Sequence, residues 1–413
     1  MLERPLNGLG MLLVDNIGGL ATLSDGSLSK IADAAVLIDG ERIFWCGPKE
    51  QLPDVNVDQR IDANGLLVIP GLIDCHTHLL FAGERAQEFA SRMRNESYQS
   101  IMKKGGGILS TTKAFHQASD QYLLELARKR ADQILAQGVT TIEAKSGYGL
   151  NLKEELRALK LLNMLNDGHS LDIHPTFLGA HVVPAEYGHA RDRYLDLIDE
   201  MLEKIAEHQL AIDCDVFCET GAFSVDETRR ILTKANALGL GLKAHLHQLS
   251  NTNAISLVLD LPLKSISHAD YLAPHDMAIL ATGKAVVETL PIAALFLRSP
   301  VFTPVEELMA VGVKLAIATD FNPGSAMCHD LVLAARLGVT LFRFSVDAAL
   351  CAITSHAAKA LGRDDIGSIA RGHLADLVIT NCADINEFFY DWTKNPVSYV
   401  IKRGKVVVAN DLA

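Results

Sequence analysis

The sequence predicts an α/β fold of two parts, a (β/α)8 TIM barrel and a small β-sandwich domain formed from the N- and C-terminal segments. Through the middle of the chain, short apolar runs alternate with longer helical patterns, the order of parallel strands joined by crossover helices. Strand-like runs with turn residues occupy both ends. A length of 413 residues suits one large barrel with a smaller companion. We expect the composite β domain at 1–67 and 367–413 and the barrel at 68–366.

Both ends of the chain carry hairpin signals. Residues 35–46, AVLIDGERIFWC, place two apolar runs around Asp39-Gly40, a pair that tolerates the positive φ of a tight turn. Towards the other end, LADLVIT precedes VSYVIKRGKVVVA, in which Arg403-Gly404 provides the turn. We expect the strands of the two ends to pair in one small β domain.

The barrel is expected from eight candidate strands that begin after Val68-Ile69-Pro70-Gly71. Residues 122–138 and 226–239 carry apolar residues at helical spacing and finish in Gly, as helix C-caps do. An open doubly wound sheet would share this alternation, but no Gly-rich nucleotide loop follows the first strand. The strands are GLIDCHTHL, TTIEAKSGY, IHPTFLGAH, CDVFCET, LKAHLHQ, SISHAD, AVVETLP and KLAIATDFN.

Composition limits the classes of partner. Hydrophobic residues make up 49% and charged residues 21% of the chain, and no apolar run is long enough to cross a bilayer. The first residues lack the order of a signal peptide, and the seven scattered cysteines form no CxxC pair, so we expect a cytoplasmic protein with reduced thiols. A net charge of −12 argues against nucleic acid but is compatible with a small anionic substrate and with a homodimer.

Four residues form a predicted metal site. His76 and His78 follow the first strand in DCHTH, and alternation along a strand points both imidazoles to one side. His245 ends the fifth strand and Asp320 the eighth. Because barrel active sites lie at the carboxyl ends of the strands, we expect all four to hold one zinc or iron ion with a position open to water. His247 follows the same alternation and remains an alternative to His245.

Other polar residues in or near the strands are further candidates for catalysis or metal binding. His268, which ends the sixth strand, faces the predicted barrel mouth and could stabilise charge on an attacked carbonyl oxygen. His174 begins its strand at the opposite end. Glu219 or Cys218 could bridge a second metal ion, although the fourth strand contains no lysine for a bridging carbamate and Lys145 belongs to the second. We therefore expect a mononuclear site.

PGLIDCHTHLLFAGER, EAKSGYGL, the late His245 and Asp320, and the closing GSIARGHLADLVI together resemble the amidohydrolase superfamily, and within it the imidazolonepropionase family. The similarity covers essentially the whole chain, and HTHLLFAGER and KSGYGL are far more specific than the HxH pair. The resemblance implies a barrel with a β domain built from both termini and a zinc or iron cofactor. It also implies hydrolysis of 4-imidazolone-5-propanoate to N-formimidoyl-L-glutamate, a step of histidine degradation.

The resemblance further implies a set of substrate-binding residues. Arg85 can hold a carboxylate through two parallel hydrogen bonds, although a surface salt bridge would explain it equally well. The loop FNPGS would bring backbone N–H groups and the Asn322 amide near the ligand, unless it is an ordinary Pro-Gly turn. The positions that match are Arg85, Tyr148, His181, Gln248, Asn322, Gly324 and Ser325.

Gln248 departs from the pattern of many amidohydrolases, which place a proton-shuttling Glu three residues after the fifth-strand histidine. An amide cannot shuttle protons. We therefore assign proton transfer to Asp320, assisted by His268, and expect Gln248 to read the amide edge of the substrate ring.

Two other functions remain open on the sequence alone. An aminohydrolase of the guanine or cytosine deaminase kind would share the metal ligands, but Arg85 and Tyr148 do not suit a flat, uncharged base. A non-catalytic barrel that serves as a scaffold would have no reason to keep all four ligands.

Overall fold

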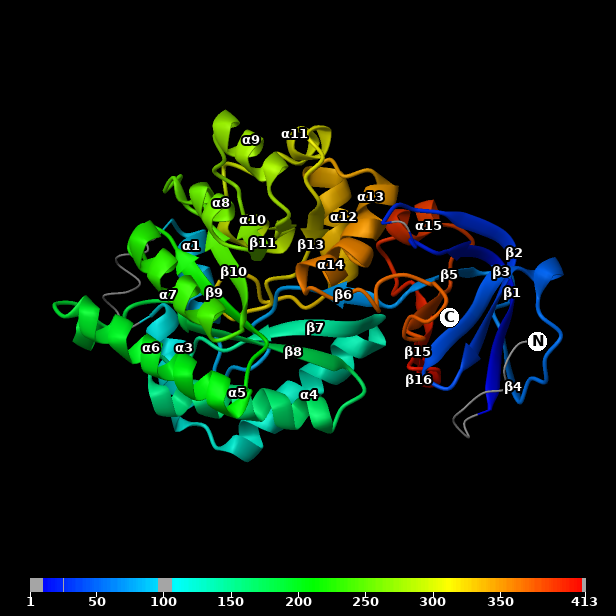
Figure 1. The fold of residues 1–413 in the computed structure, drawn as a ribbon, viewed down its shortest axis with the longest axis horizontal. Coiled ribbons are helices and arrows are strands. Elements are labelled where there is room, and N and C mark those ends of the chain that lie inside the picture. Colours follow the sequence, from blue (N-terminus) through cyan, green and yellow to red (C-terminus); the bar gives the residue numbers. More distant parts are fainter. Residues whose placement is uncertain (1–9, 25, 96–105, 411–413) are drawn as a thin grey trace.

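The computed structural model describes residues 10–24, 26–95 and 106–410. It has two lobes: a parallel barrel wrapped by helices and a separate mixed sheet that contains both ends of the chain (Figure 1). The strands of the barrel are β6 (Leu72–Asp74), β7 (Val139–Lys145), β8 (Asp172–Ala180), β9 (Asp213–Cys218), β10 (Gly241–Leu246), β11 (Leu263–His268), β12 (Val286–Thr289) and β13 (Leu315–Ile317).

The barrel strands pair in chain order from β6 to β13, all of them parallel. Residues beyond the ends of the first and last strands bring β6 and β13 together. Thr77 bridges Phe321, and the Asp320 N–H donates to the carbonyl of His76 at 3.0 Å. The Asp74 carboxylate accepts from Thr319 Oγ1 at 2.6 Å across the same seam. All eight candidate strands are confirmed, and with them the barrel.

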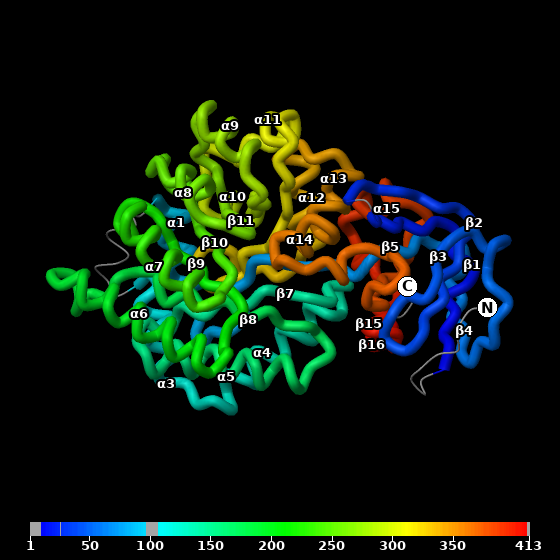
Figure 2. Tube along the Cα trace, viewed as in Figure 1, coloured from blue at the N-terminus to red at the C-terminus, as the bar shows by residue number. Residues whose placement is uncertain are grey.

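The second lobe is one continuous mixed sheet in which N-terminal and C-terminal strands meet where β5 pairs with β14. The blue N-terminal and the orange to red C-terminal segments lie together in this lobe (Figure 2). It encloses its own apolar core, because side chains from both ends of the chain pack in one buried cluster. Its strands are β1 (Met11–Ala21), β2 (Lys30–Asp39), β3 (Arg42–Pro48), β4 (Gln59–Asp62), β5 (Leu67–Pro70), β14 (Leu377–Thr380), β15 (Val397–Lys402) and β16 (Lys405–Ala409).

Both expected hairpins are present in this sheet. β2 and β3 turn at Gly40, whose φ is +58°, and β15 and β16 turn at Arg403-Gly404. Because β5 belongs to the terminal sheet, the chain enters the barrel only after this strand. The domain limits at 67/68 and 366/367 stay a prediction, and residues 1–9 and 411–413 of the expected β domain lie outside the described residues.

Helices surround the barrel, and the terminal sheet packs against one side of it (Figure 1). The two helical patterns singled out in the sequence are α4 and α7; Ser224 and Glu227 form a capping box at the start of α7. The helices are α1 (Ala86–Met93), α3 (Ile108–Gln117), α4 (Asp120–Ala136), α5 (Leu152–Asp167), α6 (Arg191–His208), α7 (Val225–Ala237), α8 (Leu257–Asp260), α9 (Pro274–Thr282), α10 (Pro291–Leu297), α11 (Val305–Ala310), α12 (Leu331–Leu341), α13 (Val346–Ala352), α14 (Ser355–Ala360) and α15 (Ile385–Tyr390).

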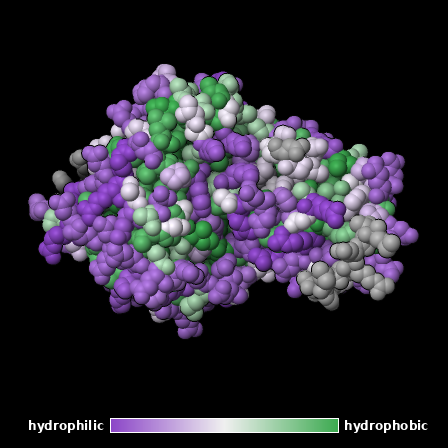
Figure 3. Space-filling view, viewed as in Figure 1, coloured by the Kyte–Doolittle hydropathy of each residue, from purple (hydrophilic) through white to green (hydrophobic). Residues whose placement is uncertain are grey.

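The surface is predominantly hydrophilic on the face drawn in Figure 3, with smaller apolar areas over the helices. Apolar side chains instead fill the space between the barrel strands and the surrounding helices. Within the described ranges, none of the helices has the length and apolar character needed to span a bilayer.

Candidate metal centre and substrate site

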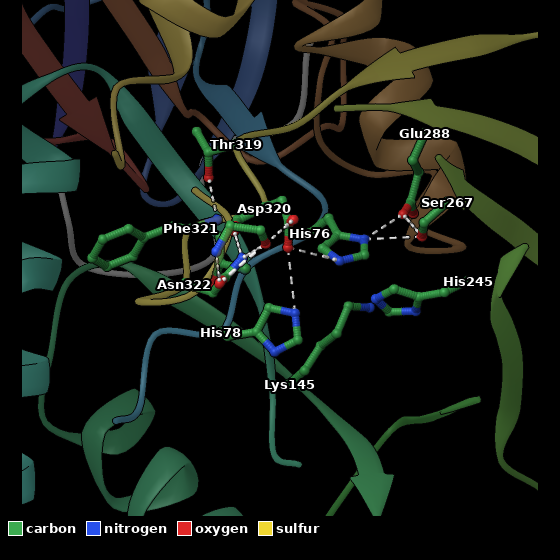
Figure 4. Close-up of polar contacts among 12 residues, drawn as sticks. His76, His78, Lys145, His245, Ser267, Glu288, Thr319, Asp320, Phe321 and Asn322 are labelled. Atoms are coloured by element: carbon green, nitrogen blue, oxygen red, sulfur yellow. Dashed lines mark hydrogen bonds and ion pairs between the residues drawn. The ribbon is translucent and has the colours of Figure 1, made fainter. Parts of the chain in front are cut away.

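The barrel places the predicted metal ligands together at the carboxyl ends of its strands. The potential ligand atoms of His76, His78 and His245 all lie within 4.8 Å of one another, and all three residues are buried. Asp320 reaches the same point: its Oδ1 lies 3.5 Å from His76 Nε2 and 3.4 Å from His78 Nε2 (Figure 4). In the described part of the chain, His76, His78 and His245 form the group of potential metal-ligand side chains whose ligand atoms lie close enough to hold one ion.

The chemistry of these donors fits a metal ion. Among the described residues, His76 Nε2 is buried and makes no hydrogen bond, although it lies beside Asp320 and the other imidazoles. A buried ring nitrogen without a partner is costly unless a ligand satisfies it. Three imidazoles and one carboxylate are ligands that suit zinc or iron. The residues present therefore fit the cofactor expected from the sequence.

The imidazoles of His76 and His245 are oriented by hydrogen bonds at Nδ1, on the side of each ring away from the metal site. His76 Nδ1 lies 2.9 Å from Ser267 Oγ and 3.0 Å from Glu288 Oε2. His245 Nδ1 lies 3.0 Å from Asp215 Oδ1. These contacts occupy Nδ1 and leave Nε2 of each ring for a metal, which is the usual arrangement of a metal-bound histidine.

His268 lies at the same mouth. Its ring centroid is 6.1 Å from that of His76 and 5.6 Å from that of His245. Burial lowers the pKa of His268 to about 3, so the imidazole is neutral at pH 7 and can donate one N–H to an oxyanion. The residue has a φ of +72°, and its carbonyl accepts from Thr303 Oγ1 at 2.9 Å, which holds this uncommon backbone conformation.

His247 lies apart from the metal group. β10 ends at Leu246, and His247 has a φ of +56°, so strand alternation stops before it. Its Nε2 accepts the backbone N–H of Ala254, and its Nδ1 lies 3.8 Å from Asp276. The choice of His245 over His247 therefore agrees with the geometry.

Tyr148 and His181 form one wall of the site. Their ring centroids are 5.9 and 5.4 Å from that of His78, respectively. Burial raises the pKa of the Tyr148 hydroxyl, which therefore remains a donor at neutral pH. Burial also lowers the pKa of His181 to about 3, and its Nδ1 lies 3.1 Å from the carbonyl of Gly147. The neutral ring donates there, so its Nε2 is an acceptor.

Arg85 lies at the start of α1 with a carboxylate already beside it. Glu88 accepts from Arg85 Nε at 2.9 Å and from Nη2 at 2.6 Å, so this fork of the guanidinium is occupied by the protein itself. Nη1 lies against Gly324 in the loop that follows β13: a Cβ built on Gly324 would lie only 2.3 Å from this nitrogen. Arg92 Nη2 donates to the carbonyl of Gly324 at 2.6 Å. The sequence analysis missed both Glu88 and Arg92, whose spacing from Arg85 by three and seven residues is a helical signal.

The loop that follows Asp320 is held by its own hydrogen bonds. Asn322 Oδ1 accepts from the N–H groups of Gly324 and Ser325, each at 2.8 Å. Asn322 Nδ2 donates to the carbonyl of Asp320 at 2.6 Å. The Asn322 amide thus shapes the loop that is expected to lie near the ligand. Gly324 still permits close approach, and Ser325 Oγ lies 3.4 Å from Asp320 Oδ2.

Two further candidates lie after the middle strands. Gln248 lies two residues beyond the end of β10 and is half-buried. Glu219, named in the sequence analysis as a residue that could bridge two metal ions, accepts the N–H groups of Leu249 at 2.9 Å and Thr220 at 2.8 Å. Its carboxylate is therefore committed to the loops after β9 and β10.

Comparison with known proteins decides the family. The amidohydrolase family model matches residues 67–407. The chain is 41% identical over 396 residues to an imidazolonepropionase of Shewanella baltica, a match that covers 94% of this chain and 97% of that protein. A Shewanella sediminis imidazolonepropionase is 40% identical, with 95% and 97% covered. This chain belongs to the imidazolonepropionase family of amidohydrolases.

Solved structures support the amidohydrolase fold. Atrazine chlorohydrolase from Arthrobacter aurescens, complexed with zinc, superposes with a TM-score of 0.75 at 17% identity, over 97% of this chain and 95% of that one. An adenosine deaminase from Xanthomonas campestris with bound zinc gives a TM-score of 0.74 at 18% identity, over 96% and 93%. Imidazolonepropionases and these more distant hydrolases thus share one architecture with this chain.

Proposed function

We propose that this chain hydrolyses 4-imidazolone-5-propanoate to N-formimidoyl-L-glutamate with one zinc or iron ion per subunit. The observation that carries the proposal is the placement of Arg85 Nη1 against Gly324, four residues after the metal-site residue Asp320. A cation there suits a substrate whose ring meets the metal group while its propanoate reaches the guanidinium. The names of the relatives, at 40–41% identity over nearly the whole chain, point to the same substrate.

The four ligands would be His76, His78, His245 and Asp320. When bound there, a divalent ion supplies Lewis acidity, which polarises a carbonyl and makes water easier to deprotonate. A single ion is favoured because β9 contains no lysine, and Lys145 on β7 is engaged by Asp215 at 2.6 Å. Metal analysis that finds two ions in each active chain would contradict the mononuclear proposal.

Asp320 is the proposed proton carrier. Burial opposes its charge, but contact with His78 and the other imidazoles keeps its pKa below the ordinary value. The carboxylate is thus ionised at neutral pH and can take a proton from water as the oxygen attacks the ring carbonyl carbon. The C–N bond of the ring then breaks, and the same proton passes to the departing nitrogen.

The surrounding residues would bind and orient the ring. His268 donates its single N–H to the developing oxyanion, and His181 offers Nε2 as an acceptor for a ring N–H. The Gln248 amide both donates and accepts, so it can read the amide edge of the ring. Tyr148 adds a neutral donor. The product is a single ring-opened molecule equal to the substrate plus one water, and no ammonia is formed.

The test is to incubate metal-loaded protein with freshly generated imidazolone propanoate, following its absorbance and the appearance of formiminoglutamate. We expect turnover that requires metal. If protein that retains its metal does not turn over imidazolone propanoate, the proposed substrate is wrong. Ammonia release from a heterocyclic amine without turnover of imidazolone propanoate would establish the deaminase alternative instead.

A further inference from the structure

A continuous network of charged side chains lies inside the barrel, next to the metal group. Its members come from four strands and are fully buried, and the catalytic steps proposed above make no use of them. Three carboxylates and two ammonium groups give the network a formal charge of −1. The residues are Glu143, Lys145, Asp215, Lys243 and Glu288.

Lys243 is the centre of one half of the network. Its Nζ lies 2.8 Å from Glu288 Oε1 and 2.9 Å from Glu143 Oε1, and it donates to the carbonyl of Cys75 at 3.0 Å. Cys75 directly precedes His76. Lys243 therefore ties β10 to β12 through Glu288 and to the backbone beside His76.

Glu288 completes the link to the metal group. While Oε1 faces Lys243, Oε2 accepts from Ser267 Oγ at 2.7 Å and lies 3.0 Å from His76 Nδ1. Oε1 thus forms an ion pair with Lys243 while Oε2 accepts from Ser267, and both contacts favour the orientation in which the carboxylate faces the imidazole. In Figure 4, Glu288 and Ser267 lie on the side of the His76 ring that faces away from His78.

The other half of the network repeats this arrangement at His245. Lys145 Nζ lies 2.6 Å from Asp215 Oδ2 and 2.7 Å from Glu143 Oε2, and Asp215 Oδ1 lies 3.0 Å from His245 Nδ1. Glu143 joins the halves because each of its oxygens faces one lysine. Each of these two imidazoles is therefore backed by a carboxylate that is itself fixed by a buried lysine.

We propose that Glu288, fixed by Lys243, is a positioning residue that holds His76 in its metal-binding orientation and thereby sets how tightly the site retains its metal. Glu288 lies behind the imidazole on the side away from the proposed metal position. The inference rests on the metal centre of the proposed function but not on the identity of the substrate. A carboxylate held on two sides restricts the ring to one tautomer and one orientation before the metal arrives.

The test compares zinc retention by three loaded proteins: wild type, Glu288→Gln and Asp376→Asn. Asp376 is a matched control, because it is a buried carboxylate paired with Lys402 at 2.6 Å in the terminal sheet. Zinc release to excess chelator is followed with a colorimetric indicator, and thermal midpoints are measured on the same samples. We expect Glu288→Gln to weaken zinc retention by about 10- to 100-fold, the usual effect of removing such a partner, and Asp376→Asn to leave it unchanged.

A double variant separates position from charge. Glu288→Gln alone makes the network neutral, whereas Glu288→Gln combined with Lys243→Met restores its formal charge of −1 without restoring the carboxylate behind His76. Positioning predicts that the double variant still loses zinc quickly. Zinc retention equal to wild type in the double variant, or in Glu288→Gln itself, would overturn the proposal.

Ser267→Ala provides a milder variant should Glu288→Gln fail to fold. It removes both the hydrogen bond from Ser267 Oγ to Glu288 Oε2 and the contact of Ser267 Oγ with His76 Nδ1, so zinc release should be faster than in wild type. Unchanged release from Ser267→Ala would then count against the proposal. A wild-type protein that holds no zinc would instead refute the metal centre itself. The two failures are therefore distinguishable.

Discussion

Replacing Arg85 with Met tests how the site recognises a carboxylate. The side chain is 12% exposed, Glu88 occupies Nε and Nη2, and Nη1 faces Gly324. A hydrogen bond to a charged group contributes about 1.5–3 kcal/mol, so its loss should lower kcat/KM by about 10- to 150-fold, mostly through KM. The metal content should not change, because Arg85 contacts none of the four proposed ligands.

Glu88 should lower kcat/KM further in Arg85→Met. In Arg85→Met its carboxylate loses its cationic partner, keeps the N–H of Gly107 and repels the propanoate of the substrate. Arg85→Met combined with Glu88→Gln should therefore regain part of the lost kcat/KM. The sequence analysis expected Arg85 to grip the substrate with two parallel bonds; the ion pair with Glu88 predicts instead that Nη1 makes the principal contact unless the substrate displaces Glu88.

The assay compares steady-state kinetics on imidazolone propanoate and on a ring analogue without the carboxylate. Arg94→Met, an exposed arginine just after α1, is the matched control and should behave as wild type. The reasoning is refuted if Arg85→Met matches wild type on imidazolone propanoate, or if it loses the same factor on both substrates, since the latter would mean that Arg85 acts only on the local fold.

Three further predictions concern catalysis and stability. Asp320→Asn should lower kcat by at least about 100-fold because it removes the proton carrier, and an unchanged kcat in protein with full metal content would exclude that role. His268→Gln should reduce kcat by about 100- to 1,000-fold with little change in KM, whereas His247→Gln should chiefly lower the thermal midpoint. The opposite result would mean that His247 is the catalytic residue and His268 the structural one. Asp213 pairs with His174 and Lys264, and despite burial these partners lower its pKa to about 2 from 3.8, so its stabilising contribution is present above pH 4 and is lost as the pH falls towards 2. Asp213→Asn should therefore cost about 2 kcal/mol at pH 7 in denaturant unfolding, with a gap from wild type that narrows by about 1 kcal/mol at pH 3; a gap independent of pH would contradict the pKa shift.

The proposed ligands could be found from the sequence because each lies at or just beyond the end of an apolar strand. His76, His78, His245 and Asp320 needed only the barrel rule to bring them together. The eight strands and both hairpins followed from the same local patterns. Strand alternation left His247 as an alternative to His245, and only the family resemblance favoured His245. The turn that removes His247 from the site became visible in the structure.

The residues behind the ligands were missed for a physical reason. Glu288 and Asp215 lie inside buried strands and were interpreted from the sequence as part of a strand rather than as a site. A buried charge must be paired, so the lysines at 145 and 243 were an available signal. Which lysine meets which carboxylate depends on the stagger between strands, and the sequence does not reveal that register.

The hydrogen bonds of the loop after Asp320 were also beyond sequence reasoning. Asn322 is expected near the ligand, and its side chain also closes a turn with Gly324 and Ser325, a role that was not foreseen. Asn commonly bonds the backbone two residues on, so the FNPGS segment allowed both interpretations. The hydrogen bonds of Asn322 within the loop became visible only in the structure.

The most direct test of the central claim is turnover of imidazolone propanoate by metal-loaded protein in water enriched in ¹⁸O, with the product analysed by mass spectrometry. Hydrolysis at the ring carbonyl predicts a single product equal to substrate plus one water, with the heavy oxygen in the newly formed carboxylate and no ammonia released. A product that has lost nitrogen, or a label anywhere other than that carboxylate, would contradict the account.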